Sequence, residues 1–140
     1  MNRACWPAAP DGRYWIDAAL GTMSVRLMLD TGLVHPLHHV GLELAPVLFD
    51  NLRQAGQMVG AGQRQRRDAS GQLVVMLAGL MRAQLIDPVI RQVIGPVVSV
   101  SAFRGALNVP SRVGVEFFHR LTGCRADWDF DNRLWCVECP

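Results

Sequence analysis

Short apolar segments, separated by turn-forming residues, follow one another along the 140-residue chain. Residues 14–20 and 23–29 predict a β-hairpin, because two strand-like segments flank a Gly-Thr pair that supplies the turn. The other strand-like segments are residues 73–80, 85–94 (interrupted by Pro88), 97–103, 126–130 and 134–137. The sequence therefore predicts a mainly β fold.

Two segments are helical in character. In residues 45–55, Pro46 suits the first turn, and Gly56 stands where a C-terminal cap belongs. Residues 113–121 predict a second, short helix that begins at a glycine. The residues of this second helix expected to face the core are Val115, Phe118 and Leu121. We therefore expect one or two short helices beside the strands.

A segment rich in glycine and arginine separates the first helix from the next strand. Residues 56–71 contain four glycines and no aliphatic run beyond Met58-Val59. Arg64, Arg66 and Arg67 lie in the middle of this segment. The pattern predicts a mobile, basic excursion between strands.

Composition narrows the class of protein. Half of the residues are hydrophobic and 19% are charged, which favours a packed core over disorder. The length fits one domain, residues 14–140, after an N-terminal arm at residues 1–13. A net charge of +2 is too small to indicate binding to nucleic acid or to membranes. Residues 1–10 lack the apolar core of a signal peptide, and residues 73–86 are too short to span a bilayer, so we expect a soluble, cytoplasmic protein.

The tripeptide Asp30-Thr31-Gly32 ends the second strand of the predicted hairpin. A carboxylate at the end of an apolar strand is a costly place for a charge. A simple turn is one interpretation, because Asp and Gly are common where strands stop. A functional carboxylate is the other, and the surrounding sequence bears on the choice.

This context resembles the retropepsin-like aspartic proteases, a family of retroviral-type and bacterial single-domain enzymes. A hydrophobic strand runs into Asp-Thr-Gly, and later an arginine and an aliphatic residue, Arg112-Val113, precede Gly114 and a short helix with Phe117-Phe118. A hairpin over residues 127–137 then closes the chain, as in bacterial relatives. The resemblance covers residues 14–137 and implies the closed β-barrel of the acid protease fold.

What the resemblance implies for function is a homodimeric aspartic endopeptidase. One chain holds one Asp-Thr-Gly, so two copies would bring Asp30 and its twin together about a two-fold axis. The two carboxyl groups would share one proton, and the ionised one would activate a water that attacks a peptide bond. Thr31 would hydrogen-bond across the dimer, and Gly32 would allow close approach of the backbones. No metal and no cofactor is implied, and the partners are a second copy and a peptide or protein substrate.

The resemblance also implies substrate-binding residues. Residues 60–71 would be the flap that folds over bound peptide, with Gly60, Ala61 and Gly62 facing the substrate. Leu33 would stand beside the cleft, where the family usually has Ala or Ser. This bulky residue leaves an alternative open, in which the same fold serves as a catalytically inactive dimerisation or peptide-binding module.

A second departure from the pattern of the family concerns a pair of charged residues. Retroviral members pair an acidic residue shortly after the Asp-Thr-Gly with an arginine in the second half of the chain. The corresponding positions here are apolar, Val34 and Val115. Because the acid and the arginine are both absent, no buried charge is left unpaired, and we expect the fold to tolerate the loss.

Three other groups of residues have the composition of possible sites. Asp127, Asp129, Asp131 and Glu138 match most of an EF-hand calcium loop, but alternation with aromatic residues favours a strand with one solvent-exposed face.

Cys136 and Cys139 have the spacing of a zinc or redox half-site, and Cys5 and Cys124 stand apart in sequence. Unrelated thiols are the favoured interpretation, with contact across a dimer interface, if oxidised, as the alternative. His35, His38 and His39 are interpreted as a partly exposed histidine loop rather than a metal site.

Overall fold

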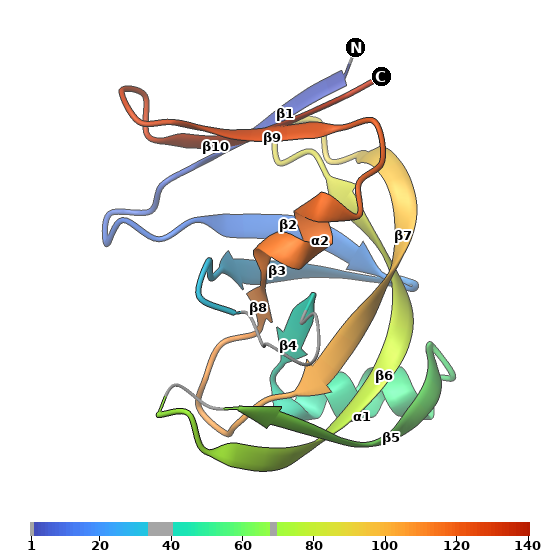
Figure 1. Ribbon diagram of the computed structural model, residues 1–140. Coiled ribbons are helices and arrows are strands. Elements are labelled where there is room, and N and C mark those ends of the chain that lie inside the picture. Colours follow the sequence, from blue (N-terminus) through green and yellow to red (C-terminus); the bar gives the residue numbers. More distant parts are fainter. Residues whose placement is uncertain (1, 34–40, 68–69) are drawn as a thin grey trace.

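The computed structural model describes residues 2–33, 41–67 and 70–140 (Figure 1). Its strands are β1 (Asn2–Pro7), β2 (Trp15–Leu20), β3 (Met23–Leu29), β4 (Leu42–Leu44), β5 (Met58–Arg67), β6 (Leu73–Ile86), β7 (Val93–Arg104), β8 (Arg112–Val113), β9 (Arg125–Asp129) and β10 (Leu134–Cys139). Its helices are α1 (Pro46–Gln54) and α2 (Val115–His119). The predicted mainly β fold with short helices is confirmed.

The strands form two sheets. The larger sheet has seven strands in the order β2-β3-β8-β4-β7-β6-β5, and β2 also pairs with β6, so the series of pairings returns to its first strand. The smaller sheet has the order β1-β10-β9 and brings the two ends of the chain together (Figure 1). The segment expected to be an N-terminal arm thus contributes β1 to this terminal sheet.

The local predictions agree with the structure where turn residues mark the ends of elements. β2 and β3 form the predicted hairpin, with Leu20 opposite Met23 and Gly21 at φ 59° in the turn. The first helix ends where expected, since Gly56 follows it at φ 73°. Such left-handed backbone favours glycine because a side chain would clash there.

Two predictions about strands need correction. In residues 85–94 the interruption expected at Pro88 is longer than predicted: β6 ends at Ile86, and residues 87–92 lie outside the strands before β7. In this segment Asp87 Oδ1 accepts hydrogen bonds from the backbone N–H groups of Val89 and Ile90. Residues 58–67, predicted within a mobile excursion, form β5 along the edge of β6. The glycines and arginines of this segment give no alternating apolar pattern, so the sequence does not predict a strand here. The strand is stabilised by its pairing with β6.

The core lies between the sheets and the helices. Phe49 and Leu52 bury one face of α1, while α2 contributes Phe117 and Phe118. The ring of Phe118 packs edge-on against Trp135 of β10 at 5.2 Å between centroids, which ties α2 to the terminal sheet. In the second helix, Phe118 and Leu121 are buried as predicted, but the predicted core residue Val115 is only half-buried.

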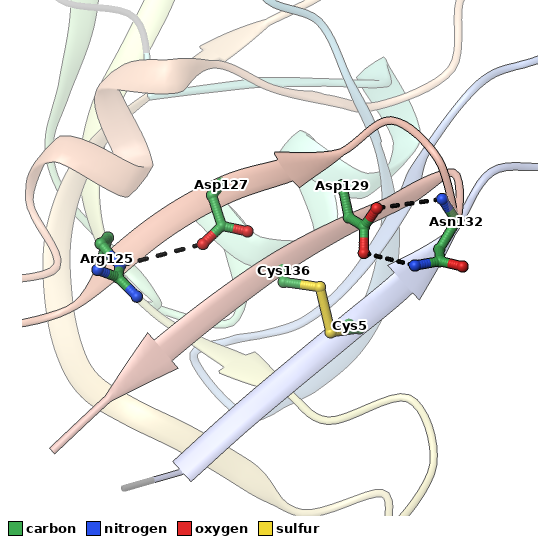
Figure 2. Close-up of a disulfide and its surroundings, with 6 residues drawn as sticks. All are labelled: Cys5, Arg125, Asp127, Asp129, Asn132 and Cys136. Carbon is green, nitrogen blue, oxygen red and sulfur yellow. Dashed lines mark hydrogen bonds and ion pairs between the residues drawn. A yellow bond between two sulfur atoms is a disulfide. The ribbon is translucent and has the colours of Figure 1, made fainter.

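All four cysteines form disulfides within the chain, which corrects the interpretation as unrelated thiols and replaces contact across a dimer. Antiparallel pairing sets Cys5 of β1 directly opposite Cys136 of β10, and the two are bonded (Figure 2). Cys124, just before β9, is bonded to Cys139. Disulfides persist mainly in oxidising compartments, and the cytoplasmic location expected from the sequence stays a prediction. Among the described residues, no helix is long and apolar enough to cross a membrane.

The acidic residues of the C-terminal hairpin lie on a strand and its turn, as predicted, rather than in a calcium-binding loop. Asp127 and Asp129 alternate with Trp128 along β9, and Figure 2 shows the two carboxylates on one side of the terminal sheet. Asp129 accepts hydrogen bonds from the backbone and side-chain nitrogens of Asn132, which closes the turn. These bonds to Asn132 lower the pKa of Asp129. The carboxylate of Asp129 thus serves the hairpin, in agreement with the strand interpretation.

Candidate active site

Asp30 follows directly after β3, where this strand lies beside β8. The two strands are parallel, with Met28 opposite Arg112 and Leu29 opposite Val113. The backbone N–H of Asp30 continues this ladder by donating to the carbonyl oxygen of Val113 at 2.9 Å. The position of Asp30 is therefore fixed by a strand from the other end of the chain.

The Asp-Thr-Gly turn holds the carboxylate from one side. Oδ1 of Asp30 accepts a hydrogen bond from the backbone N–H of Gly32 at 2.9 Å, and the N–H of Leu33 donates to the carbonyl oxygen of Asp30 at 3.1 Å. The Asp30 side chain is 27% exposed. Thr31 and Gly32 are exposed at the surface of the single chain.

Arg112 holds the other carboxylate oxygen. Its Nη1 donates to Oδ2 of Asp30 at 2.8 Å, and its Nη2 donates to Oε1 of Glu43 in β4. The side chain of Arg112 is 20% exposed and that of Glu43 only 6%. One guanidinium thus bridges a partly exposed carboxylate and a buried one. We call these three residues the Glu43–Arg112–Asp30 chain.

The Glu43–Arg112–Asp30 chain was not predicted from the sequence. The family resemblance places an acid–arginine pair at Val34 and Val115, and because both are apolar the pair is expected to be lost. Val34 lies outside the described residues, and Val115 begins α2. In the sequence, Arg112 is marked only by its place before Val113 and Gly114. The signal that identifies its role is its register opposite Glu43, and this becomes visible only when β4 and β8 are paired.

Leu33 is covered in the single chain. It is 2% exposed and packs in a small cluster with Ala78 and Phe103. Its predicted contact with substrate therefore stays a prediction, and what the structure adds is a packing role. This cluster joins the Asp-Thr-Gly turn to β6 and β7.

The predicted flap residues lie on β5, next to that cluster. Gly62 is opposite Ala78 in the β5–β6 hairpin, and the register shifts between Val59 and Gly62. Gly60, at φ 64°, lines a hollow of about 290 Å³ together with Phe103. Ala78, which lies opposite Gly62, belongs to the same cluster as Leu33. Ala61 lies between Gly60 and Gly62 and is half-buried.

The arginines of β5 and the histidines after the Asp-Thr-Gly turn were the other charged residues singled out in the sequence. Arg64 donates to the carbonyl oxygen of Gln63, and Arg67 to that of Gly71 at 2.7 Å, so both guanidinium groups contact the backbone of their own hairpin. His35, His38 and His39 lie outside the described residues. A larger cavity of about 530 Å³ borders Gly21, at the opposite end of β3 from Asp30, and is separate from the candidate site.

Comparison with solved structures shows the fold. A crystal structure of a retropepsin-like aspartic protease from Rickettsia conorii matches with a TM-score of 0.61 and 17% sequence identity, over 99% of this chain and 91% of that one. No protein-family model matches the sequence. No curated protein matches it either. At this identity the likeness establishes a retropepsin-like fold, as the resemblance of the sequence implied, and leaves activity to be argued from the site.

Proposed function

We propose that this protein is one half of a homodimeric aspartic endopeptidase, with Asp30 of each subunit forming the catalytic dyad. The observation that carries the proposal is the position of Asp30, at the end of β3 and bonded to the backbone of β8, in a chain with a retropepsin-like fold. Return of the strand pairings to β2 supports the closed barrel of that fold.

The proposed chemistry needs two chains. Two carboxylates that face each other closely do not both ionise at low cost, so the pair shares one proton. The ionised carboxyl takes a proton from a bound water as this water attacks the peptide carbonyl. The protonated carboxyl donates a hydrogen bond to the carbonyl oxygen, where negative charge develops.

The residues around Asp30 have matching roles in this proposal. The N–H of Gly32 fixes Oδ1, and exposed Thr31 is available for a hydrogen bond to the twin turn. The β5–β6 hairpin acts as the flap over a peptide, with Gly60 to Gly62 along the covering strand.

A second candidate function is a catalytically inactive module that dimerises or binds peptides. Two observations favour it. Leu33 is buried beside the turn, and Arg112 already occupies Oδ2 of Asp30. Both candidates use the same fold, so cleavage is what separates them.

The test is cleavage of a peptide mixture, read by mass spectrometry, with wild type, Asp30→Asn and the control Asp131→Asn. Asp131 is an exposed aspartate of the terminal hairpin, outside the site. We expect wild type and Asp131→Asn to cleave the same bonds, Asp30→Asn to cleave none, and sedimentation to give a dimer for all three. Cleavage by Asp30→Asn would refute the dyad. Peptide binding without cleavage by wild type would favour the inactive module.

A further inference from the structure

The Glu43–Arg112–Asp30 chain crosses three neighbouring strands at the end of the sheet where β3 stops. β8 lies between β3 and β4, and Arg112 is opposite Met28 on one side and Glu43 on the other. The guanidinium uses different nitrogens for its two partners, Nη1 for Asp30 and Nη2 for Glu43. It therefore contacts both carboxylates at once.

Glu43 fixes the guanidinium from the buried side. All three residues of β4 are buried, and a carboxylate at this depth needs a cation close to it. The turn after β7 covers Glu43 closely, since a Cβ added at Gly105 would lie 3.3 Å from Cγ of Glu43. Arg112 cannot swing toward solvent without giving up its contact with this buried carboxylate.

Asp30 does not need the guanidinium for its own solvation. Its side chain is 27% exposed, and a carboxylate in that position can be hydrated by water. What Arg112 adds is orientation, because Gly32 holds Oδ1 while Arg112 holds Oδ2 at 2.8 Å. With a donor on each oxygen, the carboxylate is restrained from rotating about its last torsion.

We infer that Arg112 is a positioning residue for Asp30 and that Glu43 holds Arg112 in this role. The inference rests on the proposed aspartic peptidase function and extends it to two residues outside the Asp-Thr-Gly turn. In a dimer, each Asp30 would meet its twin in a fixed orientation, because a donor holds each of its oxygens.

The test compares Arg112→Met and Arg112→Lys with a matched control, Arg104→Met. Arg104 also forms an arginine–carboxylate pair, with Asp50 at 3.1 Å, but it joins β7 to α1 and does not touch Asp30. We expect Arg112→Met to lower kcat by about tenfold to a hundredfold with KM little changed, because only orientation is lost. Arg112→Lys should recover part of the loss, and Arg104→Met should leave kcat unchanged.

Loss of folding is controlled by a charge-balanced variant. Arg112→Met leaves Glu43 without this cation, so we would also make Glu43→Gln together with Arg112→Met, which removes both charges. This double variant should fold and still have the low kcat. Unchanged kcat in the folded double variant would overturn the inference, since Arg112 would then be only structural. A higher kcat would also overturn it, because Arg112 would then block Asp30.

A separate readout distinguishes failure of the inference from failure of the proposed function. If wild type cleaves no peptide, the proposed peptidase fails, but the carboxyl carbon signal of Asp30 in NMR still reports its surroundings. We expect this signal to move in Arg112→Met and in Glu43→Gln, and to stay in place in Arg104→Met. A signal unmoved by either substitution would overturn the positioning role whatever the activity.

Discussion

Cys5 and Cys136 are 131 positions apart in the sequence and are joined by a disulfide, with their Cα atoms 4.1 Å apart. The bond crosses the terminal sheet between β1 and β10 (Figure 2). The first strand is thereby paired and covalently joined within its own chain. In the oxidised state, the proposed dimer would therefore have to form without exchange of β1 between chains.

Removing this disulfide should destabilise the chain more than removing the second one. In the chain-entropy view, a bond that closes a long loop restricts the unfolded chain more. We expect Cys5→Ser with Cys136→Ser to lower the free energy of unfolding by about 4–5 kcal/mol. For Cys124→Ser with Cys139→Ser, whose sequence separation is 15, we expect about 3 kcal/mol. Urea unfolding measures both, and an equal loss for the two pairs would contradict the argument.

Gly95 should resist substitution because of the second disulfide. Its backbone has φ 74°, and a Cβ added there would lie 2.9 Å from Sγ of Cys139. We expect Gly95→Ala to lower the free energy of unfolding by about 2–4 kcal/mol, from backbone strain and overpacking together. Gly12→Ala is the matched control, because Gly12 has φ 85° with open space around it. A loss no larger than that of Gly12→Ala would show that contact with the sulfur does not matter.

The ion pair between Asp50 and Arg104 should contribute to stability in a pH-dependent way. The hydrogen bond from Arg104 holds the pKa of Asp50 below its ordinary value of 3.8. A carboxyl whose pKa is lowered by folding adds stability above its unfolded pKa, and this contribution is lost as the pH falls through the folded pKa. Asp50→Asn should therefore lower the urea midpoint at pH 7 and show a smaller further decrease below pH 4 than wild type. If the urea midpoints of wild type and Asp50→Asn fell in parallel as the pH decreases, this assignment would be contradicted.

The parts of the fold that were predictable are those encoded by neighbouring residues. The hairpin of β2 and β3 follows from two strand-like segments around Gly21, and α1 from Pro46 and Gly56. The position of Asp30 at the end of a strand was equally local. These features need no knowledge of which segments meet in the folded chain.

The parts that were missed depend on pairing between distant segments. β5 carries glycine and arginine in place of an alternating pattern and forms because β6 lies beside it. Arg112 is 82 positions from Asp30 and 69 from Glu43, so no local pattern joins them. The cysteines likewise find their partners only through the register of β1, β9 and β10.

The proposal that each chain is half of an active site is tested most directly by mixing subunits. Wild-type chains and Asp30→Asn chains would be unfolded together in equal amounts and refolded, and peptide cleavage would be measured per wild-type chain. If one Asp30 from each subunit is required, random pairing leaves only about half of the wild-type chains with an intact partner, so the activity per wild-type chain falls by about half. Refolding with Asp131→Asn chains, which carry an intact Asp30, should instead about double the activity per wild-type chain, because every dimer is then active. Full activity per wild-type chain in the presence of Asp30→Asn would contradict the shared dyad.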